Sequence, residues 1–326
     1  MFKTRITEMF GIEYPVMSAP MAMHSGGRIA AAVSAAGGLG AFGAIHLTNG
    51  PDWLRGEIEH IRSHTDRPFG VGFITNFIPM FQPLFDATIE ARPPIIVLSF
   101  GDPRPYVQPA KAAGAQVICQ VQTIGGAKTA VEAGADILVA QGNEAGGHTG
   151  TMNLLPFLAR VLDTHPNVPV IAAGGISDGR TLAAALAAGA DAACVGTAFL
   201  ATPECVEVPE EHKRAIVESN GEDTIYTRTY DVLWGAPWPE GIAERVHRNQ
   251  FTDEWHGRYE EIVERRQELQ TRVEAAEKTF DPADRAILYG QSAGAVSAVR
   301  PAAEVLREIC DDAERILRER LPQLLK

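Results

Sequence analysis

The chain has 326 residues, of which 45% are hydrophobic and 21% are charged, as in an ordinary soluble globular protein. Its formal net charge of −12 argues against a nucleic-acid-binding surface, because phosphate recognition requires clustered lysine and arginine side chains. No apolar run approaches the roughly 18–20 residues that cross a bilayer, which argues against a membrane protein.

The first residues and the cysteines indicate a cellular compartment. Residues 1–5 lead into charged sequence without the apolar core of a signal peptide. The cysteines are far apart and lack metal-ligand spacing, and Cys119 and Cys194 lie in apolar runs that predict buried thiols. We therefore expect a cytoplasmic protein. The four cysteines are Cys119, Cys194, Cys205 and Cys310.

Eight short apolar runs, separated by helix-sized gaps, predict eight β-strands. The runs are almost continuously apolar rather than alternating, which is typical of parallel strands covered by helices. Several follow an alanine-rich segment that ends in glycine, as expected where a helix closes before the next strand. The predicted strands centre on Tyr14–Met17, Leu39–Ala44, Phe69–Phe73, Ile95–Phe100, Val117–Val121, Ile137–Ala140, Val168–Ala172 and Ala193–Val195.

Eight strands that alternate with helices predict an α/β fold, the (β/α)8 TIM barrel. An open doubly wound sheet is the alternative. It would be expected to carry a dinucleotide-binding G-x-G-x-x-G motif that opens a helix after the first strand, and the sequence has none there. The barrel would comprise residues 1–202 and 287–326.

Residues 203–286 lack the alanine and glycine rhythm and are rich in aromatic and charged side chains. We expect an inserted, mostly helical lid or substrate domain there, followed by the last barrel helix at Ala302–Leu317. Two prolines and two glycines predict a loop at Gly235–Gly241, and Trp255–Lys278 is predicted as one charged helix. The aromatic side chains, Trp238 among them, could pack a small core or exclude water at the barrel mouth.

The segment Gln141–Gly150 follows the sixth apolar run and holds four glycines in ten residues. Glycines allow sharp turns and a close approach to a ligand. His148 directly follows two of them, and an imidazole suits proton transfer near neutral pH. A glycine-rich turn with a surface histidine is the alternative. Because (β/α)8 enzymes act at the carboxyl ends of their strands, the position favours a loop with a site residue.

Two residue pairs that contain glycine follow the seventh and eighth apolar runs, and (β/α)8 barrels often bind phosphate at these positions. Gly174 and Gly175 come after the seventh run, and Gly196 and Thr197 after the eighth. Each pair offers backbone N–H donors and a following helix N-terminus, and Thr197 adds a hydroxyl group. Glycines that only close turns are the alternative. We interpret the two pairs as a phosphate site for a substrate or a flavin.

Other strand ends could support a flat ring system. The turn Ala19-Pro20-Met21 is small and apolar, and the amides of Gln120 and Gln141 could bond donor and acceptor edges of a flavin ring. No lysine at a strand end suggests a Schiff base. No cluster of aspartate, glutamate and histidine is evident that would hold a metal.

The chain resembles the nitronate monooxygenase family, also called 2-nitropropane dioxygenases, which are FMN-containing (β/α)8 barrels with a lid domain. The resemblance covers essentially the whole chain. The residues that carry it are Gln141-Gly142-x-Glu144-Ala145-Gly146-Gly147-His148-x-Gly150, Ala172-Ala173-Gly174-Gly175-Ile176, Gly196-Thr197-x-Phe199 and Gly290-Gln291-Ser292-Ala293-Gly294.

This resemblance implies that His148 is the catalytic base and that the protein binds FMN without a metal. Gly72 stands where some relatives have asparagine, and Gln120 where others have lysine, which leaves the flavin potential and the charge preference for substrates open. The implied cofactor-binding residues are Ala19, Pro20, Met21, Gly72, Gln120, Gln141, Gly146, Gly147, Gly174, Gly175, Gly196 and Thr197.

The implied reaction is the FMN-dependent oxidation of nitronates or nitroalkanes by O2 to a carbonyl compound and nitrite. An NAD(P)H-dependent flavin reductase acting on quinones or enoyl thioesters is the main alternative, because such enzymes share the barrel and a similar loop. A flavin-free lyase or isomerase and a binding protein are further alternatives. The expected partners are O2 and a small nitronate or other apolar or ring-bearing compound, with NAD(P)H in the alternative. The oligomeric state is open, with a homodimer as one option.

Overall fold

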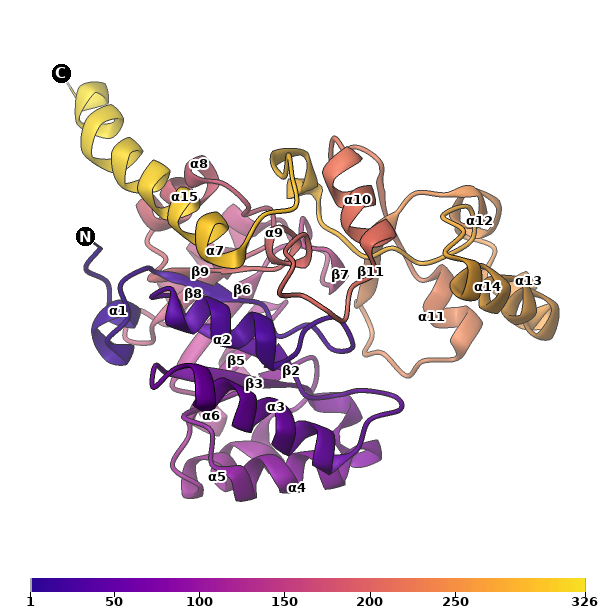
Figure 1. Cartoon of the computed structure of the whole chain (residues 1–326), viewed down its shortest axis with the longest axis horizontal. Helices are drawn as coiled ribbons and strands as arrows, with labels where there is room; N and C mark the ends of the chain where they lie inside the picture. Colours follow the sequence, from indigo (N-terminus) through magenta and orange to yellow (C-terminus); the bar gives the residue numbers. More distant parts are fainter. Residues whose placement is uncertain (1, 326) are drawn as a thin grey trace.

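Eight parallel strands form a closed barrel in the computed structural model, which describes residues 2–325 (Figure 1). The strand order is β1-β9-β8-β6-β5-β4-β3-β2, and a parallel bridge between Met17 and Leu39 joins the two ends of this order. Each predicted run overlaps one strand, and the (β/α)8 fold is confirmed. The strands are β1 (Val16–Ser18), β2 (Gly40–Gly43), β3 (Phe69–Ile74), β4 (Ile95–Ser99), β5 (Gln116–Val121), β6 (Ile137–Gln141), β8 (Val170–Ala173) and β9 (Ala192–Val195).

Small and branched side chains fill the barrel interior. Side chains alternate along a strand, so one set points inward while the other packs on the helices. The inward set leaves no channel, so chemistry belongs at an end of the barrel. Cys119 and Cys194 are both buried, as predicted. The inward-facing cluster includes Met17, Leu39, Ala41, Ile95, Val97, Ile118, Ile137, Val139, Ile171, Ala173, Ala192 and Cys194.

Eight helices surround the strands, one after each. The last of these helices packs against α8 and α2 and so completes the ring. It confirms the helix predicted at Ala302–Leu317. The chain then continues as a π-helical turn, η3 (Ile316–Arg320), and a 3-10 turn, η4 (Leu321–Leu325). The helices are α2 (Gly27–Ala35), α3 (Pro51–His64), α4 (Gln82–Ala91), α5 (Arg104–Ala112), α6 (Ile124–Ala133), α7 (Leu154–Thr164), α8 (Gly179–Ala187) and α15 (Ala302–Arg315).

The two ends of the barrel are covered differently. At one end, α1 (Arg5–Phe10) packs Ile6 and Phe10 against the inward-facing cluster. Short elements follow the strands at the other end: the 3-10 turns η1 (Thr75–Met80) and η2 (Gln291–Ala295), and α9 (Thr197–Leu200). The carboxyl ends of the strands lie at this second end.

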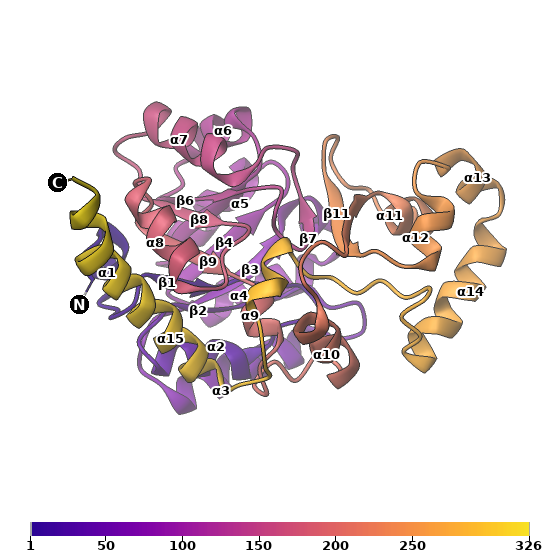
Figure 2. The same ribbon diagram turned by 90° about the horizontal axis from the view of Figure 1, so that it is seen from above.

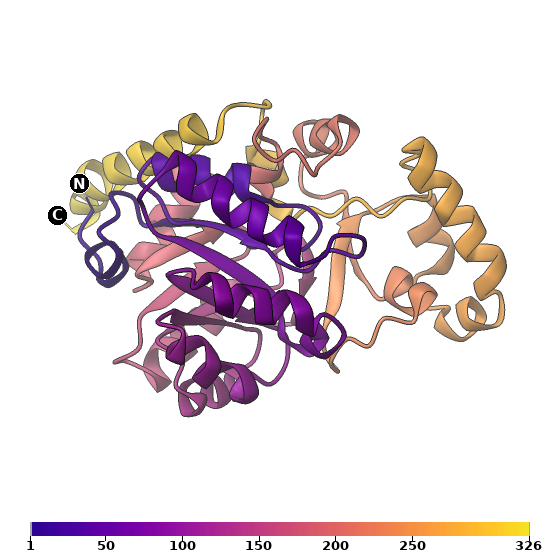
Figure 3. The same ribbon diagram turned by 60° about the horizontal axis from the view of Figure 1, so that its bottom comes forward.

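We use the word lid for residues 203–286, whose boundaries stay a prediction. Figures 1 and 2 place α11–α14 on the side of the barrel where β7 and β11 lie, with both chain termini on the opposite side. In Figure 3 a strand separates the lid helices from the barrel. The lid elements are α10 (Glu210–Glu218), β10 (Thr224–Thr227), α11 (Thr229–Trp234), β11 (Ala243–His247), α12 (Gln250–Trp255), α13 (Tyr259–Glu264) and α14 (Arg266–Thr279).

Two sequence predictions for local structure were wrong. Trp255–Lys278 is not one helix, because Gly257 adopts a positive φ of 84° and the chain restarts as α13 and then α14. The segment before Gly150 is not wholly a loop either. Its residues Gly147–Thr149 form a strand, β7, in a small antiparallel sheet of order β10-β11-β7 that ties the barrel to the lid. The predicted loop at Gly235–Gly241 is present.

Candidate active site

Five of the predicted cofactor residues lie at the carboxyl end of the barrel, and we call them the end layer. Four of them lie two residues beyond a member of the inward-facing cluster on their strands, and Gly72 lies between Val71 and Phe73, which pack on the helices. The layer therefore changes from branched apolar side chains to glycine, alanine and glutamine just where the barrel opens. These residues are Ala19, Gly72, Gln120, Gln141 and Gly196.

The turn after β1 packs closely over this layer. A Cβ atom on Gly72 would lie 2.3 Å from Cβ of Pro20, and one on Gly196 would lie 3.5 Å from Sδ of Met21. Gly72 is thus glycine because Pro20 occupies the space of its side chain. The result is a flat, apolar floor that spans three strand ends.

Backbone N–H groups converge beside this floor. Gly174 and Gly175 have positive φ values of 104° and 71°, which glycine adopts at little cost. Within residues 2–325, the N–H groups of Gly174, Gly175, Gly196 and Thr197 donate to no protein acceptor. The Thr197 hydroxyl accepts from the Gly290 N–H at 3.0 Å, which leaves its own proton free to donate. These donors fit an anionic group such as a flavin phosphate.

The loop between β6 and β7 is packed against the segment that returns from the lid. A Cβ atom on Gly146 would lie 2.4 Å from backbone atoms of Tyr289 and Gly290, and the Gln291 N–H donates to the Glu144 carbonyl at 3.0 Å. The absence of a side chain at Gly146 is therefore explained by this backbone contact. The contact fixes the position of the strand that follows.

His148 lies in the middle of β7, opposite Glu244 of β11. Its Nε2 atom is 2.8 Å from Oδ1 of Asp231, which α11 of the lid supplies. The Gln141 side-chain amide donates to the His148 carbonyl at 3.1 Å and accepts from the Gln122 amide at 2.9 Å. Barrel and lid thus hold the histidine from both sides.

The loop Gly235–Gly241 places an indole ring on the histidine. The rings of Trp238 and His148 are stacked, with centroids 3.5 Å apart and planes at 15°. Trp238 also meets Phe77 and Phe100 edge-on, at 4.9 and 5.3 Å, and the Asn76 amide donates to the Pro237 carbonyl at 2.6 Å. A lid side chain therefore closes over the barrel end, as one of the two sequence interpretations expected.

Two buried carboxyl groups accompany His148. Asp231 and Glu244 are 7% and 4% exposed, and one ligand atom from each of the three residues lies within 4.8 Å of the others. Asp231 Oδ2 and Glu244 Oε1 have no hydrogen-bond partner in the described part of the chain. Burial, and next the charge of Asp231, raise the pKa of Glu244 well above its usual range. The sequence analysis missed this cluster because its members are distant in sequence.

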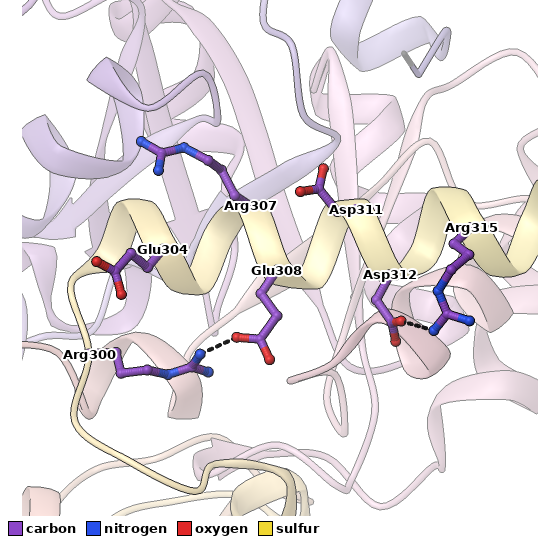
Figure 4. A pocket seen from close by; sticks show the side chains of 7 residues that line it. All are labelled: Arg300, Glu304, Arg307, Glu308, Asp311, Asp312 and Arg315. Carbon is purple, nitrogen blue, oxygen red and sulfur yellow. Dashed lines mark hydrogen bonds and ion pairs between the residues drawn. The ribbon is translucent and has the colours of Figure 1, made fainter.

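A hollow on the outer face of α15 offers no comparable chemistry (Figure 4). Four of its seven charged side chains are joined in ion pairs, Arg300 with Glu308 and Arg315 with Asp312. A groove between α8 and α15, lined by Ser177, Val296 and neighbours, is likewise separate from His148. The carboxyl end of the barrel is therefore the candidate active site.

Comparison with known proteins identifies the family. The family model described as nitronate monooxygenase matches residues 3–84 and 78–312. The chain belongs to this family. Nitronate monooxygenases are flavin-dependent oxidoreductases, and the chain is an enzyme of this class. Among residues 2–325, no helix combines the length and the apolar character that a bilayer crossing requires.

Individual known proteins and solved structures are similar to most of the chain. A 5-hydroxy-7a-methyl-1-oxo-octahydro-1H-indene-4-carboxyl-CoA dehydrogenase from Mycobacterium tuberculosis is 34% identical over 77% of this chain and 68% of its own length. FabK from Thermotoga maritima matches with a TM-score of 0.86 and 32% identity over 99% of this chain and 100% of that one. Nitroalkane oxidase from Streptomyces ansochromogenes has a TM-score of 0.81 and 29% identity over 98% and 99% of the two chains.

Proposed function

We propose that the chain oxidises nitronates and nitroalkanes with O2 and FMN to a carbonyl compound and nitrite, with His148 as the base. The observation that carries this proposal is the pairing of His148 Nε2 with Asp231 Oδ1 at the carboxyl end of the barrel. A histidine oriented by a carboxylate is a typical general base. Similarity to a nitroalkane oxidase over almost the whole chain supports the substrate class.

The residues at the barrel end fit an FMN molecule. The free N–H groups of Gly174, Gly175 and Gly196, with the Thr197 hydroxyl, would hold its phosphate. The amide of Gln141 keeps one hydrogen and one lone pair for a ring edge after its bonds to Gln122 and His148. Gln120 lies in the same layer. When bound, the flavin would supply the oxidation–reduction chemistry, with O2 as the electron acceptor.

His148 would act on a neutral nitroalkane before oxidation. It removes the proton from the carbon next to the nitro group, and the electron pair stays on the substrate as the nitronate anion. Trp238 and the edge-on Phe77 and Phe100 exclude water from this step. A substrate that arrives as the nitronate needs no proton removal and depends less on His148.

The test is His148→Asn, assayed by nitrite release and O2 consumption with a nitroalkane and with its preformed nitronate. We expect kcat/KM on the neutral nitroalkane to fall by about 100-fold or more, the usual loss when a general base is removed. Activity on the nitronate should survive within about tenfold. Equal activity of the variant and the wild type on both substrates would contradict the proposal. So would a purified protein that is colourless and takes up no FMN.

A second candidate is an NAD(P)H-dependent reductase or a dehydrogenase of acyl thioesters. Two similarities favour it, namely the 34% identity to the indene-carboxyl-CoA dehydrogenase and the match to FabK. In such an enzyme His148 would exchange a proton with the carbon next to a thioester carbonyl. Anaerobic mixing with NADH, NADPH and a nitronate separates the candidates. Flavin bleaching by the nitronate alone supports the leading proposal, and rapid bleaching by a nicotinamide supports the second.

A further inference from the structure

We propose that Asp231 fixes His148 in the tautomer protonated at Nε2, so that Nδ1 is the atom that accepts the substrate proton, and that Glu244 assists as a neutral acid. The inference deepens the proposed function and rests on it for the identity of the substrate proton. Asp231 and Glu244 act through His148 and are therefore positioning residues. Both come from the lid.

The tautomer follows from the contact between His148 and Asp231. A carboxylate can only accept hydrogen bonds, so the Nε2 atom at 2.8 Å must carry the hydrogen. A neutral imidazole has one ring hydrogen, which leaves a lone pair on Nδ1. Across residues 2–325, no hydrogen bond engages that lone pair.

The stacked indole leaves this atom accessible. Trp238 covers the face of the His148 ring, whereas the lone pair of Nδ1 lies in the ring plane. The 15° angle between the planes keeps the ring edge clear of the indole. Trp238 therefore restricts rotation of the imidazole and removes water from its face, while the basic nitrogen remains open to a substrate from the side.

The buried pair of carboxyl groups, Asp231 and Glu244, is expected to carry one negative charge rather than two. In the described chain, neither Asp231 nor Glu244 pairs with a lysine or arginine, and Arg245 next to Glu244 in β11 turns to Asn143 instead. Two buried carboxylates without a counter-charge would be costly. A proton on Glu244 removes one charge and provides an O–H donor for the unpaired oxygen of Asp231. The raised pKa of Glu244 agrees with this arrangement.

Each proton and electron pair is accounted for when His148 deprotonates the nitroalkane. The C–H bond next to the nitro group breaks, the proton binds Nδ1, and the electron pair stays on the substrate. The cluster changes from one negative charge to neutrality, since Asp231 now faces an imidazolium. The substrate gains the negative charge that the cluster loses, so the net charge of the whole site is unchanged, and the Asp231 carboxylate stabilises the imidazolium beside it. The proton returns to solvent from Nδ1 after the product leaves.

The direct test is nitrogen NMR of ¹⁵N-histidine-labelled holoenzyme, with the His148 signals assigned by their loss in His148→Asn. We expect a protonated Nε2 and a bare Nδ1 in the wild type, and a mixture of tautomers in Asp231→Asn. A hydrogen on Nδ1 of the wild type would overturn the proposal, and so would an unchanged tautomer in Asp231→Asn. The wild-type measurement stands even where that variant fails to fold.

Kinetics provide the second test, and Glu240→Gln serves as a control because Glu240 is an exposed lid carboxylate. In Asp231→Asn we expect about a 100-fold loss of kcat/KM on a neutral nitroalkane and a change of about threefold or less on its nitronate. A purely structural role would reduce both equally and overturns the proposal. Glu244→Gln, whose amide imitates a protonated carboxyl group, should lose much less kcat/KM on the neutral nitroalkane than Asp231→Asn does.

Two further outcomes contradict the role of Glu244. One is a loss in Glu244→Gln as large as that in Asp231→Asn, which would show that Glu244 acts as an anion. The other is a stoichiometric divalent metal in the wild type that this variant loses, measured by elemental analysis. A wild type inactive on every nitro compound refutes the proposed function alone, because the tautomer of His148 is still read by NMR.

Discussion

The barrel side of the candidate site presents backbone groups and small residues, whereas the lid side presents charged and aromatic side chains. On the barrel side, glycine and small residues bring backbone N–H groups and a flat floor to fixed positions, with Gly174, Gly175 and Gly196 at strand ends. On the lid side, charged and aromatic side chains, Asp231 and Trp238, reach across to His148. Under the proposed function, the first arrangement would hold the cofactor and the second would orient the reacting histidine.

This difference explains how one barrel can serve several reactions. Backbone donors can bind a phosphate whatever the substrate is, which agrees with the similarity of this chain to both a nitroalkane oxidase and a carboxyl-CoA dehydrogenase. The reaction would then depend on which lid groups contact the histidine. His148 belongs to both sides, since β7 follows a barrel strand and pairs with β11 of the lid.

The largest expected effect tests how rigidly the barrel side is joined to the lid return. Gly146→Ala should destabilise the protein by about 3 kcal/mol, because its Cβ atom would lie 2.4 Å from backbone atoms that cannot rotate away. Urea unfolding of the holoenzyme measures the change. Gly125→Ala is the control: it lies in α6 with no atom within 4 Å, and we expect no destabilisation. Equal stabilities would show that the return segment is loosely packed.

The second effect concerns the lid carboxyl pair and depends on pH. Because the pKa of Glu244 is raised above its ordinary value of 4.5, the folded protein keeps a proton that the unfolded chain releases. Wild-type stability therefore falls as the pH rises from about 4.5 towards the folded pKa, with a slope of at most about 1.4 kcal/mol per pH unit.

Glu244→Gln removes this penalty, so its advantage in melting temperature over the wild type should grow between pH 5 and pH 8. A gap that is constant with pH would mean that Glu244 is ionised in the folded protein. Glu240→Gln, on the exposed part of the lid, should show no such trend.

Most of the barrel side was predictable and most of the lid side was not. Apolar runs signal buried strands, and strand ends locate glycines and His148, so local pattern suffices there. β7 has only the residues Gly147–Thr149 and no apolar alternation, so nothing local marks it as a strand. Asp231 and Glu244 look like any of the 41 acidic residues until β11 pairs with β7. The glycine at position 257 was the sequence signal for the broken helix, and its positive φ shows why α12 does not continue into α13.

The third effect tests the floor of the barrel end. Gly72→Ala should cost about 1–2 kcal/mol, because its Cβ atom would lie 2.3 Å from Cβ of Pro20. Removing Cβ and the ring of Pro20 should relieve the clash, so Gly72→Ala in a Pro20→Gly background should cost less than in the wild type. A double-mutant cycle of unfolding free energies gives this coupling. Additive effects would show that Pro20 does not fill the space beside Gly72.

The smallest expected effect is that of replacing Trp238, whose ring stacks on His148 but makes no hydrogen bond to it. Trp238→Ala should lower kcat/KM on a neutral nitroalkane by about three- to tenfold, because water gains access to the imidazole face and the ring loses a restraint worth about 1 kcal/mol. Trp238→Phe should recover most of the activity by restoring a flat ring. Trp234→Ala is the control, since Trp234 is a 45% exposed lid tryptophan. If Trp238→Ala instead raises activity, the stacked indole obstructs the substrate, and the lid must open before Nδ1 can accept a proton.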